Sequence, residues 1–534
     1  MADAGTGGAE GESSGGTVLA LLLAMAMFVL VIDTSLMNVS ISAVVRDLDT
    51  TVSGVQTAIA LEALVSAALI LISSKVGDLI GRRRAYVIGL LAYAVGAIAM
   101  TLAQNLATIV VFWAIVGGTG ASLLLPAMQA LIHGNFEGKA RARTYALVGA
   151  AASIAAAVGP LLGGFITTYL SWRVGFLLEA VIIAVVLCGI RLVQDVPYTG
   201  PRQIDVVGAV LSVLGMGGVV LAILVWQEGG EAVAALFLVG AASLAGLTYW
   251  LRRRSARGEP ALLDPGLFSS KHFRFGVTGQ TLQQVTLGGA MIALPIYFQM
   301  VLEYDALLAG LSLAPLSLSM FFMALIAGRR AGKRRPSAIV LVGFGLVVIG
   351  VGALIPIVPR ATSGWWFAVP LMIAGSGLGL LVSQLNNYTL APIEDERASE
   401  AAGVNSAGGS FGLSLGLALA GGVMLATLSF AFTQGADSST VLGPAEQHQV
   451  STALEDDARI MSNTQLAEQL VGQPPAVKDE IISINTDARH VALQVALGVP
   501  LLAALLGLLN GIRMVHLGDP VPAERADGGG LDLV

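Results

Sequence analysis

The sequence predicts an all-helical integral membrane protein, and its composition, its long apolar runs and the pattern within those runs carry this prediction. Of the 534 residues, 55% are hydrophobic and only 12% are charged, whereas a soluble globular chain has about one quarter charged residues. Apolar runs of about 20 residues recur along the chain, and this is the length that a helix needs to cross a bilayer core. The runs are continuous rather than alternating, which favours helices over the strands of a membrane barrel.

Fourteen apolar runs are long enough to be transmembrane helices. Their predicted bounds are 18–43, 54–74, 85–103, 107–132, 144–168, 173–193, 206–226, 233–251, 274–300, 307–328, 337–358, 366–390, 401–432 and 491–514. An even number of spans places both chain ends on one side of the membrane. By this topology 23 of the 29 lysines and arginines fall on the side of the termini, so the positive-inside rule predicts cytoplasmic termini in a multi-pass protein of the cell membrane.

Two short loops repeat one pattern of glycines and basic residues. The segment SKVGDLIGRRR (residues 74–84) follows the second span, and AGRRAGKRR (residues 327–335) follows the tenth with the same glycine spacing. Spans 1–6 and 9–14 therefore correspond in the same orientation, and spans 7 and 8 are an insert. Parallel repeats of this kind are typical of transporters, whose substrate site lies between the halves near the midplane.

The repeat and the polar segments divide the chain into domains. The predicted domains are a disordered cytoplasmic tail at 1–17, an N-terminal six-helix bundle at 18–193, two linker transmembrane helices at 206–251, a C-terminal six-helix bundle at 274–514 and a cytoplasmic tail at 515–534. Within the last bundle, residues 433–490 are a polar extracytoplasmic loop. This loop has too few apolar residues for a core of its own, so we expect it to be disordered or weakly ordered.

Several local motifs are similar to those of one transporter family. The stretch DTSLMNVS (residues 33–40) lies in the first span, GPLLGG (residues 159–164) lies in the fifth, and Trp172 and Arg173 start the sixth. With these motifs and the loop after the second span, the chain resembles the major facilitator superfamily, and within it the fourteen-span drug:proton antiporters. The resemblance implies two six-helix bundles in parallel repeat plus two inserted helices, 14 transmembrane helices in all, and transport by alternating access.

Two motifs have stated roles in the resembling family. The resemblance implies a cytoplasmic gate motif at Gly77, Asp78, Gly81, Arg82 and Arg83. In this motif the aspartate holds the cytoplasmic side closed through helix N-termini and arginines of the other half. The resemblance also implies an antiporter motif, whose members are Gly159, Pro160, Gly163 and Gly164. Small residues and a proline permit close approach and bending of a helix, and plain helix packing is the alternative explanation.

The fourth span departs from the family. In AIVGGTG (residues 114–120), Ala114 takes the place of the family's arginine and Gly117 the place of its glutamine. The basic partner that usually takes part in proton coupling is therefore missing. This departure leaves the transporter fold intact but implies that proton coupling would take a non-standard form.

Three acids stand well inside predicted spans, and these are Asp33, Glu62 and Glu179. Asp33 and Glu62 lie at similar depths on neighbouring helices. An ionisable group at the centre of a membrane helix costs at least about 2.5–3.5 kcal/mol and usually marks a substrate or proton path. Because the predicted topology leaves no cation at this depth, a dry site favours the protonated acids, and a cationic substrate could replace the proton. We therefore predict proton and substrate coupling here; the alternative is a carboxyl that only bonds a neighbouring helix.

Amide side chains complete the predicted substrate cavity. They are Asn38 in the first span and Gln280, Gln283 and Gln284 in the ninth. These groups could bond the substrate or hold helices together, at roughly 0.6 kcal/mol per contact in membranes. A cavity with acids on one side and amides on the other suits lipophilic cations or amphiphiles better than anions.

An intramembrane hydrolase is the competing class, because GGSFG (residues 408–412) and GLSLG (residues 412–416) match G-x-S-x-G. That pattern requires a strand-to-helix turn, whereas this stretch lies in an apolar helical run. All five histidines fall at or beyond the ends of predicted spans, so no base stands at the depth of these serines. The chain also lacks the G-x-x-x-x-G-K-[ST] phosphate loop. We therefore predict no enzyme activity, no catalytic residue, no metal and no cofactor.

The predicted function is secondary active efflux of multiple drugs or small molecules, by alternating access and in exchange for protons. The expected partners are an amphiphilic or cationic small molecule, protons and the lipid bilayer, without nucleic acid, and the expected state is a monomer. The alternative is an exporter or flippase of a lipid or endogenous metabolite with non-standard proton coupling.

Overall fold

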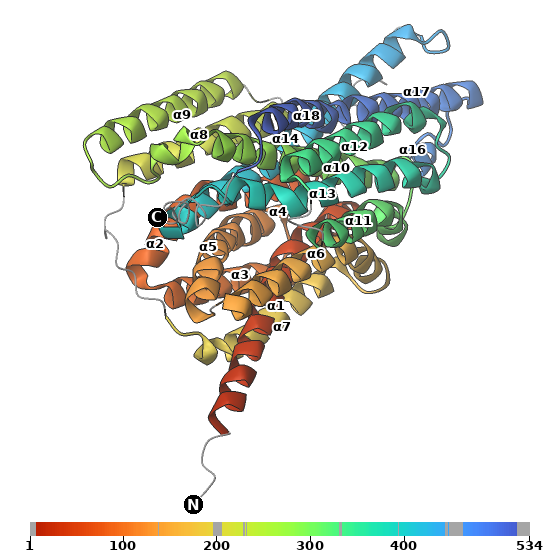
Figure 1. Cartoon of the computed structure of the whole chain (residues 1–534). Helices are drawn as coiled ribbons and strands as arrows, with labels where there is room; N and C mark the ends of the chain where they lie inside the picture. Colours follow the sequence, from red (N-terminus) through yellow and green to blue (C-terminus); the bar gives the residue numbers. More distant parts are fainter. Residues whose placement is uncertain are drawn as a thin grey trace, which may run out of the picture.

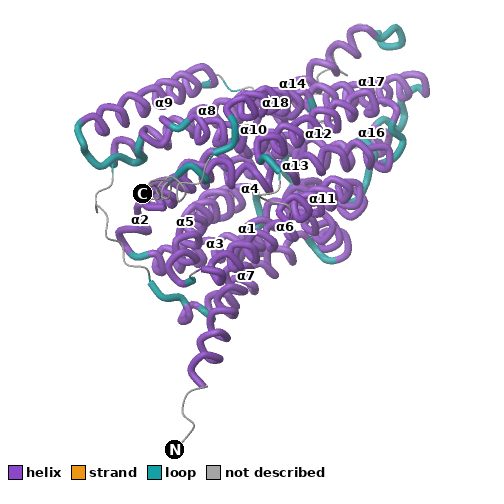
Figure 2. The backbone as a smooth tube through the Cα atoms, viewed as in Figure 1, coloured by secondary structure: helices purple, strands orange, loops and turns teal. Residues whose placement is uncertain are grey.

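Two helical bundles and a pair of inserted helices make up the protein in the computed structural model (Figure 1). The structure describes residues 7–136, 138–195, 205–227, 230, 232–329, 334–393, 395–443, 447 and 463–520. Within these residues every regular element is a helix, as the tube in Figure 2 shows. The prediction of an all-helical fold is therefore confirmed.

The helices of the first bundle and the insert follow the order of the predicted spans. The first bundle contains α1 (Gly7–Leu48), α2 (Val52–Ile80), α3 (Arg82–Leu102), α4 (Leu106–Thr108), the π-helix η1 (Ile109–Gly117), α5 (Gly118–Asn135), α6 (Gly138–Tyr169), α7 (Trp172–Cys188) and the short η2 (Ile190–Leu192). The insert consists of α8 (Val206–Gln227) and α9 (Val233–Ala256). The elements α4, η1 and α5 run on without a break and together form the fourth predicted span.

The second bundle repeats this arrangement. Its elements are η3 (Pro265–Ser269), α10 (Lys271–Met300), α11 (Ala306–Arg329), α12 (Pro336–Ile357), η4 (Val358–Arg360), η5 (Gly364–Phe367), α13 (Ala368–Leu390), α14 (Asp395–Ser438), α16 (Asn463–Gln469), α17 (Pro475–Ala496) and α18 (Gly498–Leu517). Twelve helices or helical rods of the described chain are long and apolar enough to cross a membrane. The two other predicted spans are the helices α7, of 17 residues, and α10. The count of fourteen spans therefore stays a prediction.

The two bundles meet along two pairs of helices, α6 against α11 and α2 against α14. We call the end of the bundles where α1 starts and α18 ends the terminus side, and the opposite end the distal side. Two hydrogen bonds join the bundles near the distal ends of their helices. The Ser42 amide donates to Gln299 Oε1 at 3.2 Å, and the Leu307 amide donates to Thr168 Oγ1 at 3.0 Å. These contacts hold α1 and α6 against the second bundle on the distal side.

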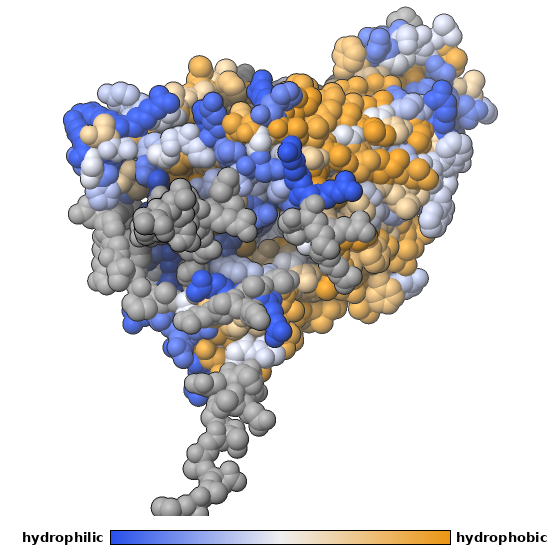
Figure 3. All heavy atoms as spheres, in the orientation of Figure 1, coloured by the Kyte–Doolittle hydropathy of each residue, from blue (hydrophilic) through white to orange (hydrophobic). Residues whose placement is uncertain are grey.

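The molecular surface is that of a membrane protein. In the view of Figure 3, a broad apolar area covers the region of α11, α12 and α13, between polar areas near α9 and near α16. Large apolar side chains are exposed there, including Phe322, Val342 and Val369. Such a continuous apolar surface is far larger than a soluble monomer exposes, and lipid tails are the solvent that fits it.

Two boundary predictions need correction. Helix α1 begins at Gly7, within the predicted disordered tail 1–17, although this segment is polar and rich in glycine and serine. The described part of the predicted loop 433–490 is in large part helical: α14 continues to Ser438, and α17 begins at Pro475 and continues into the last span. Of this loop, residues 444–446 and 448–462 lie outside the described residues, as does the tail at 521–534.

Arg489 is a further difference from the predicted topology, which placed it in the distal loop. Its side chain is buried in α17, and its Nε donates to Asn485 Oδ1 at 3.1 Å. It lines a small apolar pocket of about 30 Å³ between α10, α14 and α17, together with Tyr297, Met300 and Met424. Arg489 is therefore a buried residue of a helix rather than part of a polar loop.

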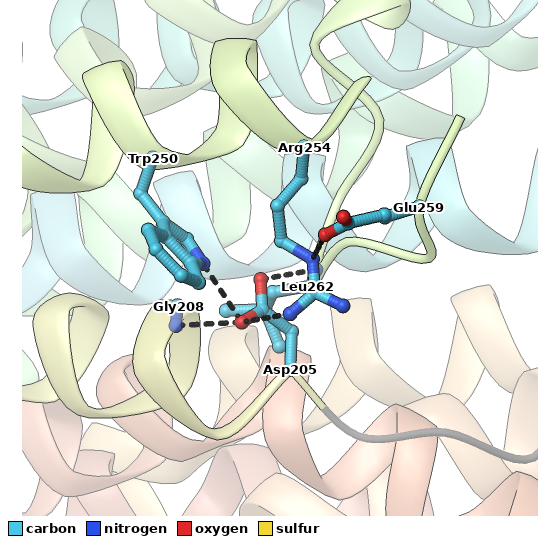
Figure 4. Close-up of polar contacts among 6 residues, drawn as sticks. All are labelled: Asp205, Gly208, Trp250, Arg254, Glu259 and Leu262. Atoms are coloured by element: carbon cyan, nitrogen blue, oxygen red, sulfur yellow. Dashed lines mark hydrogen bonds and ion pairs between the residues drawn. The ribbon is translucent and has the colours of Figure 1, made fainter. Parts of the chain in front are cut away.

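The inserted helices are held together by a buried carboxylate, Asp205, at the start of α8 (Figure 4). Its Oδ1 accepts hydrogen bonds from Trp250 Nε1 at 2.9 Å and from Arg254 Nη1 at 3.2 Å, both on α9. Its Oδ2 accepts from the amide of Leu262, in the segment before α10, at 3.1 Å. Since α8 also packs on α2 and α14, the insert lies against one of the two contacts between the bundles.

Candidate functional site

Asp33 lies in the middle of α1 with its carboxyl group buried inside the first bundle. It accepts a hydrogen bond from the hydroxyl of Tyr93 on α3. It also accepts from the indole Nε1 of Trp113 in η1, which is 3.0 Å from each carboxyl oxygen. Both donors are buried and neutral. Three helical elements therefore converge on one acid.

The π-helix η1 explains how Trp113 reaches this acid. A π-helix widens the turn and changes the direction of the side chains that follow, and such segments are frequent at functional sites. Trp113 packs edge-to-face on Phe176 of α7, with ring centroids 6.3 Å apart. Its neighbour Ala114, at the position of the family's arginine, is fully buried in the apolar core. The indole N–H of Trp113 thus donates a hydrogen bond to Asp33, next to the position at which the family has an arginine.

Glu62 on α2 and Glu179 on α7 belong to the same group of buried acids. Both lie within range of an electrostatic interaction with Asp33, so the three predicted coupling acids occupy one region of the first bundle. Within the described chain, neither carboxyl oxygen of Glu179 has a hydrogen-bond partner. A buried carboxylate without a partner is costly, which favours a neutral, protonated Glu179. The cluster can therefore hold protons.

The predicted amide residues are less closely grouped. Asn38 on α1 and Gln283 on α10 are buried, and the side-chain oxygen of each lacks a hydrogen-bond partner within the described residues. Gln280 and Gln284 are half-buried, and both lie beside Gly409 of α14. No described contact joins these glutamines to the acids, so a shared substrate cavity stays a prediction.

The gate motif forms a tight loop between α2 and α3. Gly81 ends α2 with φ of +97°, a backbone conformation that favours glycine. This turn brings the buried Arg82 back over the last turn of α2, where it forms an ion pair with Asp78. The implied partner of Asp78 was the other half of the protein. The ion pair described here lies within the motif itself, because the turn at Gly81 folds Arg82 back onto the end of α2.

Asp195 fixes the same loop from outside. It follows η2 in the chain, and its Oδ1 accepts a hydrogen bond from the Arg83 amide at 3.0 Å, at the start of α3. A Cβ atom on Gly81 would meet Asp195 Oδ2 at 2.5 Å. The segment after α7 therefore packs directly on the motif, and Gly77 lies on the inner side of the turn, next to Arg82.

The antiporter motif lies where α6 contacts both bundles. Gly159 and Gly163 face α1, where added Cβ atoms would meet Ser35 Cβ at 2.5 Å and Leu36 Cα at 2.9 Å. Gly164 faces the first turn of α11 in the other bundle, and the carbonyl of Pro160 lies against Gly310 of the same helix. The motif residues thus allow one helix to pack closely on two partners.

The G-x-S-x-G patterns lie inside α14, as the sequence predicted. Ser414 is buried, and its hydroxyl donates to the backbone oxygen of Ala60 on α2 at 2.7 Å. Gly412 and Gly416 pack against the α10 backbone at Thr281 and Val285. A serine that bonds a backbone carbonyl in mid-helix, without the strand-to-helix turn, explains the pattern as helix packing.

The family follows from a comparison with known sequences. The family model described as Major Facilitator Superfamily matches residues 23–417. The chain belongs to the Major Facilitator Superfamily. Among sequence relatives of this superfamily member are "Multidrug resistance protein Stp" of Mycobacterium tuberculosis, 27% identical over 81% of this chain and 80% of the relative, and "Puromycin resistance protein pur8" of Streptomyces alboniger, 28% identical over 82% and 87%.

Solved structures agree on the fold of this Major Facilitator Superfamily chain. A bacterial homologue of the human lysosomal transporter Spinster, inward-facing and unoccupied, matches with a TM-score of 0.61 at 12% identity, over 96% of this chain and 99% of that one. A D-xylose–proton symporter matches with a TM-score of 0.55 at 12% identity, over 76% and 89%. The family and its transporter-named relatives point to a transporter rather than an enzyme.

Sequence reasoning found the acids but missed their partners. Tyr93 is a polar aromatic residue inside the third span, and Trp113 stands next to the noted Ala114. A tyrosine or tryptophan inside an apolar span indicates a hydrogen bond to another buried polar group, since buried tyrosine and tryptophan usually find a partner. Asp195 gave no comparable signal, because it lies in the connection after the sixth span.

Proposed function

We propose that this Major Facilitator Superfamily member exports amphiphilic or cationic small molecules across the cell membrane in exchange for protons. The terminus side is cytoplasmic in this proposal, by the distribution of lysine and arginine. Relatives that cover most of the chain are named for resistance to multiple drugs or to puromycin, and another is named "Multidrug transporter protein MdtP" of Bacillus subtilis. These names support drug efflux as the general activity.

The observation that carries the proposal is the buried group of Asp33, Glu62 and Glu179. Three carboxyls in one apolar region repel one another when ionised, so at most part of the group is charged at a time. The two donors that contact Asp33 add no positive charge. Either protons or a cationic substrate can neutralise such a group. Competition between the two for one site is the basis of antiport.

The contact between α6 and α11 supports alternating access. Backbone meets backbone at Gly164 and Gly310, with no side chain between the helices. Smooth surfaces of this kind allow two rigid bundles to rock against each other around a fixed site. Opening of the distal side would separate the hydrogen bonds of Ser42 and of Leu307. The acids would then exchange protons and substrate with the opposite side.

Transport by the purified full-length chain in proteoliposomes tests the proposal. An imposed proton gradient should drive ethidium, a lipophilic cation, and a protonophore should abolish this transport. Asp33→Asn keeps the shape of the side chain but cannot titrate, so we expect at least a tenfold loss of gradient-driven transport. Asp49→Asn is the matched control, because Asp49 is exposed at the end of the same helix. Gradient-driven transport at the wild-type rate in Asp33→Asn would refute the coupling role.

The same vesicles test the alternative substrate class. A fluorescent phospholipid replaces ethidium, and its movement between leaflets is measured with and without the gradient. Lipid movement without ethidium transport would overturn the proposal in favour of a flippase. If ethidium were transported at the same rate with and without the gradient, the protein would be an efflux transporter but not a proton antiporter.

A further inference from the structure

We propose that Tyr93 and Trp113 are the positioning residues of Asp33, and that they take over the role of the missing arginine in the fourth span with neutral donors. The inference rests on the proposed function, since it concerns how Asp33 exchanges protons and cations. It names two residues, on α3 and on η1, that lie outside the predicted site.

The geometry assigns both residues to the carboxyl group. The indole N–H of Trp113 points between the two oxygens of Asp33, 3.0 Å from each, and the Tyr93 hydroxyl donates to one of them. The hydrogen bonds come from two neighbouring elements, since α3 packs on η1. The carboxyl of α1 is therefore fixed from two directions, and its rotation is restricted before substrate arrives.

The charge of the site differs from that of a carboxylate paired with arginine. An arginine would make the ionised site neutral and the protonated site positive. With tyrosine and tryptophan, the ionised site carries one negative charge and the protonated site is neutral. Binding of a monovalent cation to the ionised site therefore restores neutrality, as a proton does. The geometry points to monovalent cations as the favoured substrate class at Asp33.

The surroundings of Asp33 define which groups share in its pH response. The acids that act with it are Glu62 on α2 and Glu179 on α7, and the third titratable neighbour is Tyr93 itself. The helices α6, α10 and α11 also pack on α1. Their charged side chains stand near the helix ends, away from the middle of α1. The pH response therefore belongs to the cluster of acids and their two donors.

Two pairs of matched variants test the assignment. Trp113→Phe removes the N–H but keeps a ring against Phe176. Trp172→Phe is its control, because Trp172 packs on the same ring at 6.1 Å and donates instead to Asp47. Tyr93→Phe removes the hydroxyl, and its control is Tyr86→Phe on the same helix, since the buried Tyr86 hydroxyl lacks a partner among the described residues. The two tyrosine variants keep their rings, and the two tryptophan variants lose the same part of a buried indole. Each variant should therefore match its control in thermal stability within a few degrees.

The measurement is the pH profile of ethidium exchange in proteoliposomes. A hydrogen bond to a charged group favours the ionised form. Removal of either donor should therefore shift the midpoint of the profile to higher pH, by about one unit or more. The two control variants should keep the wild-type midpoint. Wild-type midpoints in both Trp113→Phe and Tyr93→Phe would overturn the inference, even though the proposed function would stand.

A second readout does not depend on transport. The infrared C=O stretch of the Asp33 carboxyl, identified by subtraction of the Asp33→Asn spectrum, reports its protonation and hydrogen bonding. The band should appear over a shifted pH range in Trp113→Phe and stay unchanged in Trp172→Phe. If wild-type protein showed no gradient-driven transport, the proposed function would fail, and this spectrum would still decide whether the two donors control Asp33. An unchanged band in Trp113→Phe would refute the inference.

Discussion

Gly164 of α6 lies directly against the backbone of Ala306 at the start of α11, so the two bundles touch at this point without a side chain between them. An added Cβ atom would also meet Leu307 Cα at 2.9 Å. One turn away the glycine belongs to the other helix: Gly310 of α11 faces the backbone carbonyl of Pro160 on α6. The glycine of a predicted sequence motif is therefore a direct contact between the two halves.

We predict that Gly164→Ala impairs both stability and transport. The added methyl group has to push two backbones apart, and overpacking of this kind typically costs about 1–3 kcal/mol. Thermal unfolding in detergent should occur at a lower temperature, and ethidium transport should fall at least tenfold. Gly149→Ala on the same helix is the control, because a Cβ atom there meets nothing within 4 Å. Equal behaviour of the two variants would contradict the close contact.

We predict that Asp195→Ala loosens the start of α3. The Asp195 carboxylate accepts the Arg83 amide at 3.0 Å, and loss of such a side-chain cap costs about 0.5–2 kcal/mol. Hydrogen exchange at the Arg83 amide should become faster. The Leu308 amide, which Asp305 caps in α11 at 2.7 Å, should exchange as in the wild type. Unchanged exchange at Arg83 would show that Asp195 does not hold the gate motif.

We predict that Glu179→Gln reduces proton binding without reducing the stability of the fold. Its two carboxyl oxygens have no hydrogen-bond partner within the described chain, so removal of the acid breaks no described bond. The unfolding temperature should equal that of the wild type, because a neutral amide replaces a neutral, protonated carboxyl. The number of protons released on ethidium binding, measured with a pH dye in weak buffer, should decrease. An unchanged proton count would exclude Glu179 from the coupling group.

The helices could be predicted wherever a continuous apolar run marks them, and this covers most of the fold. The start of α17 could not, because its first part is amphipathic: Ile481 and Ile484 are buried on one face, while Asp479, Ser483 and Asp487 are exposed on the other. A segment of this kind contains no uniform apolar run, so it is assigned to a polar loop when only such runs are counted. The signal that identifies this helix is the helical spacing of its apolar residues.

The acids of the site could be predicted because a carboxyl in an apolar run is rare and costly. Their partners could not, since a sequence does not reveal which faces of α3 and η1 turn towards α1. The π-helix adds to this difficulty, because its wider turn shifts the side chains away from the regular helical period. The sequence therefore marks Trp113 and Tyr93 as residues that need a hydrogen-bond partner, but only the packing of the helices shows that this partner is Asp33.

The last prediction concerns the insert, where Asp205 accepts four hydrogen bonds, from Trp250, Arg254 and the amides of Gly208 and Leu262 (Figure 4). Asp205→Ala leaves these donors without their acceptor, and breaking a buried ion pair by removal of one partner costs about 3–5 kcal/mol. We expect limited proteolysis to cut the segment between α9 and α10 sooner, and thermal unfolding to begin at a lower temperature.

A graded series sharpens this test. Asp205→Asn retains one acceptor oxygen and should fall between Asp205→Ala and the wild type. Glu259→Gln is the control, because the Glu259 side chain is exposed and forms an ion pair with Arg254 Nε at 3.4 Å. Surface ion pairs contribute at most about 1 kcal/mol, so this variant should resist proteolysis as the wild type does. If Asp205→Ala and Glu259→Gln were equally stable, the carboxylate at the start of α8 would not be what holds the insert together.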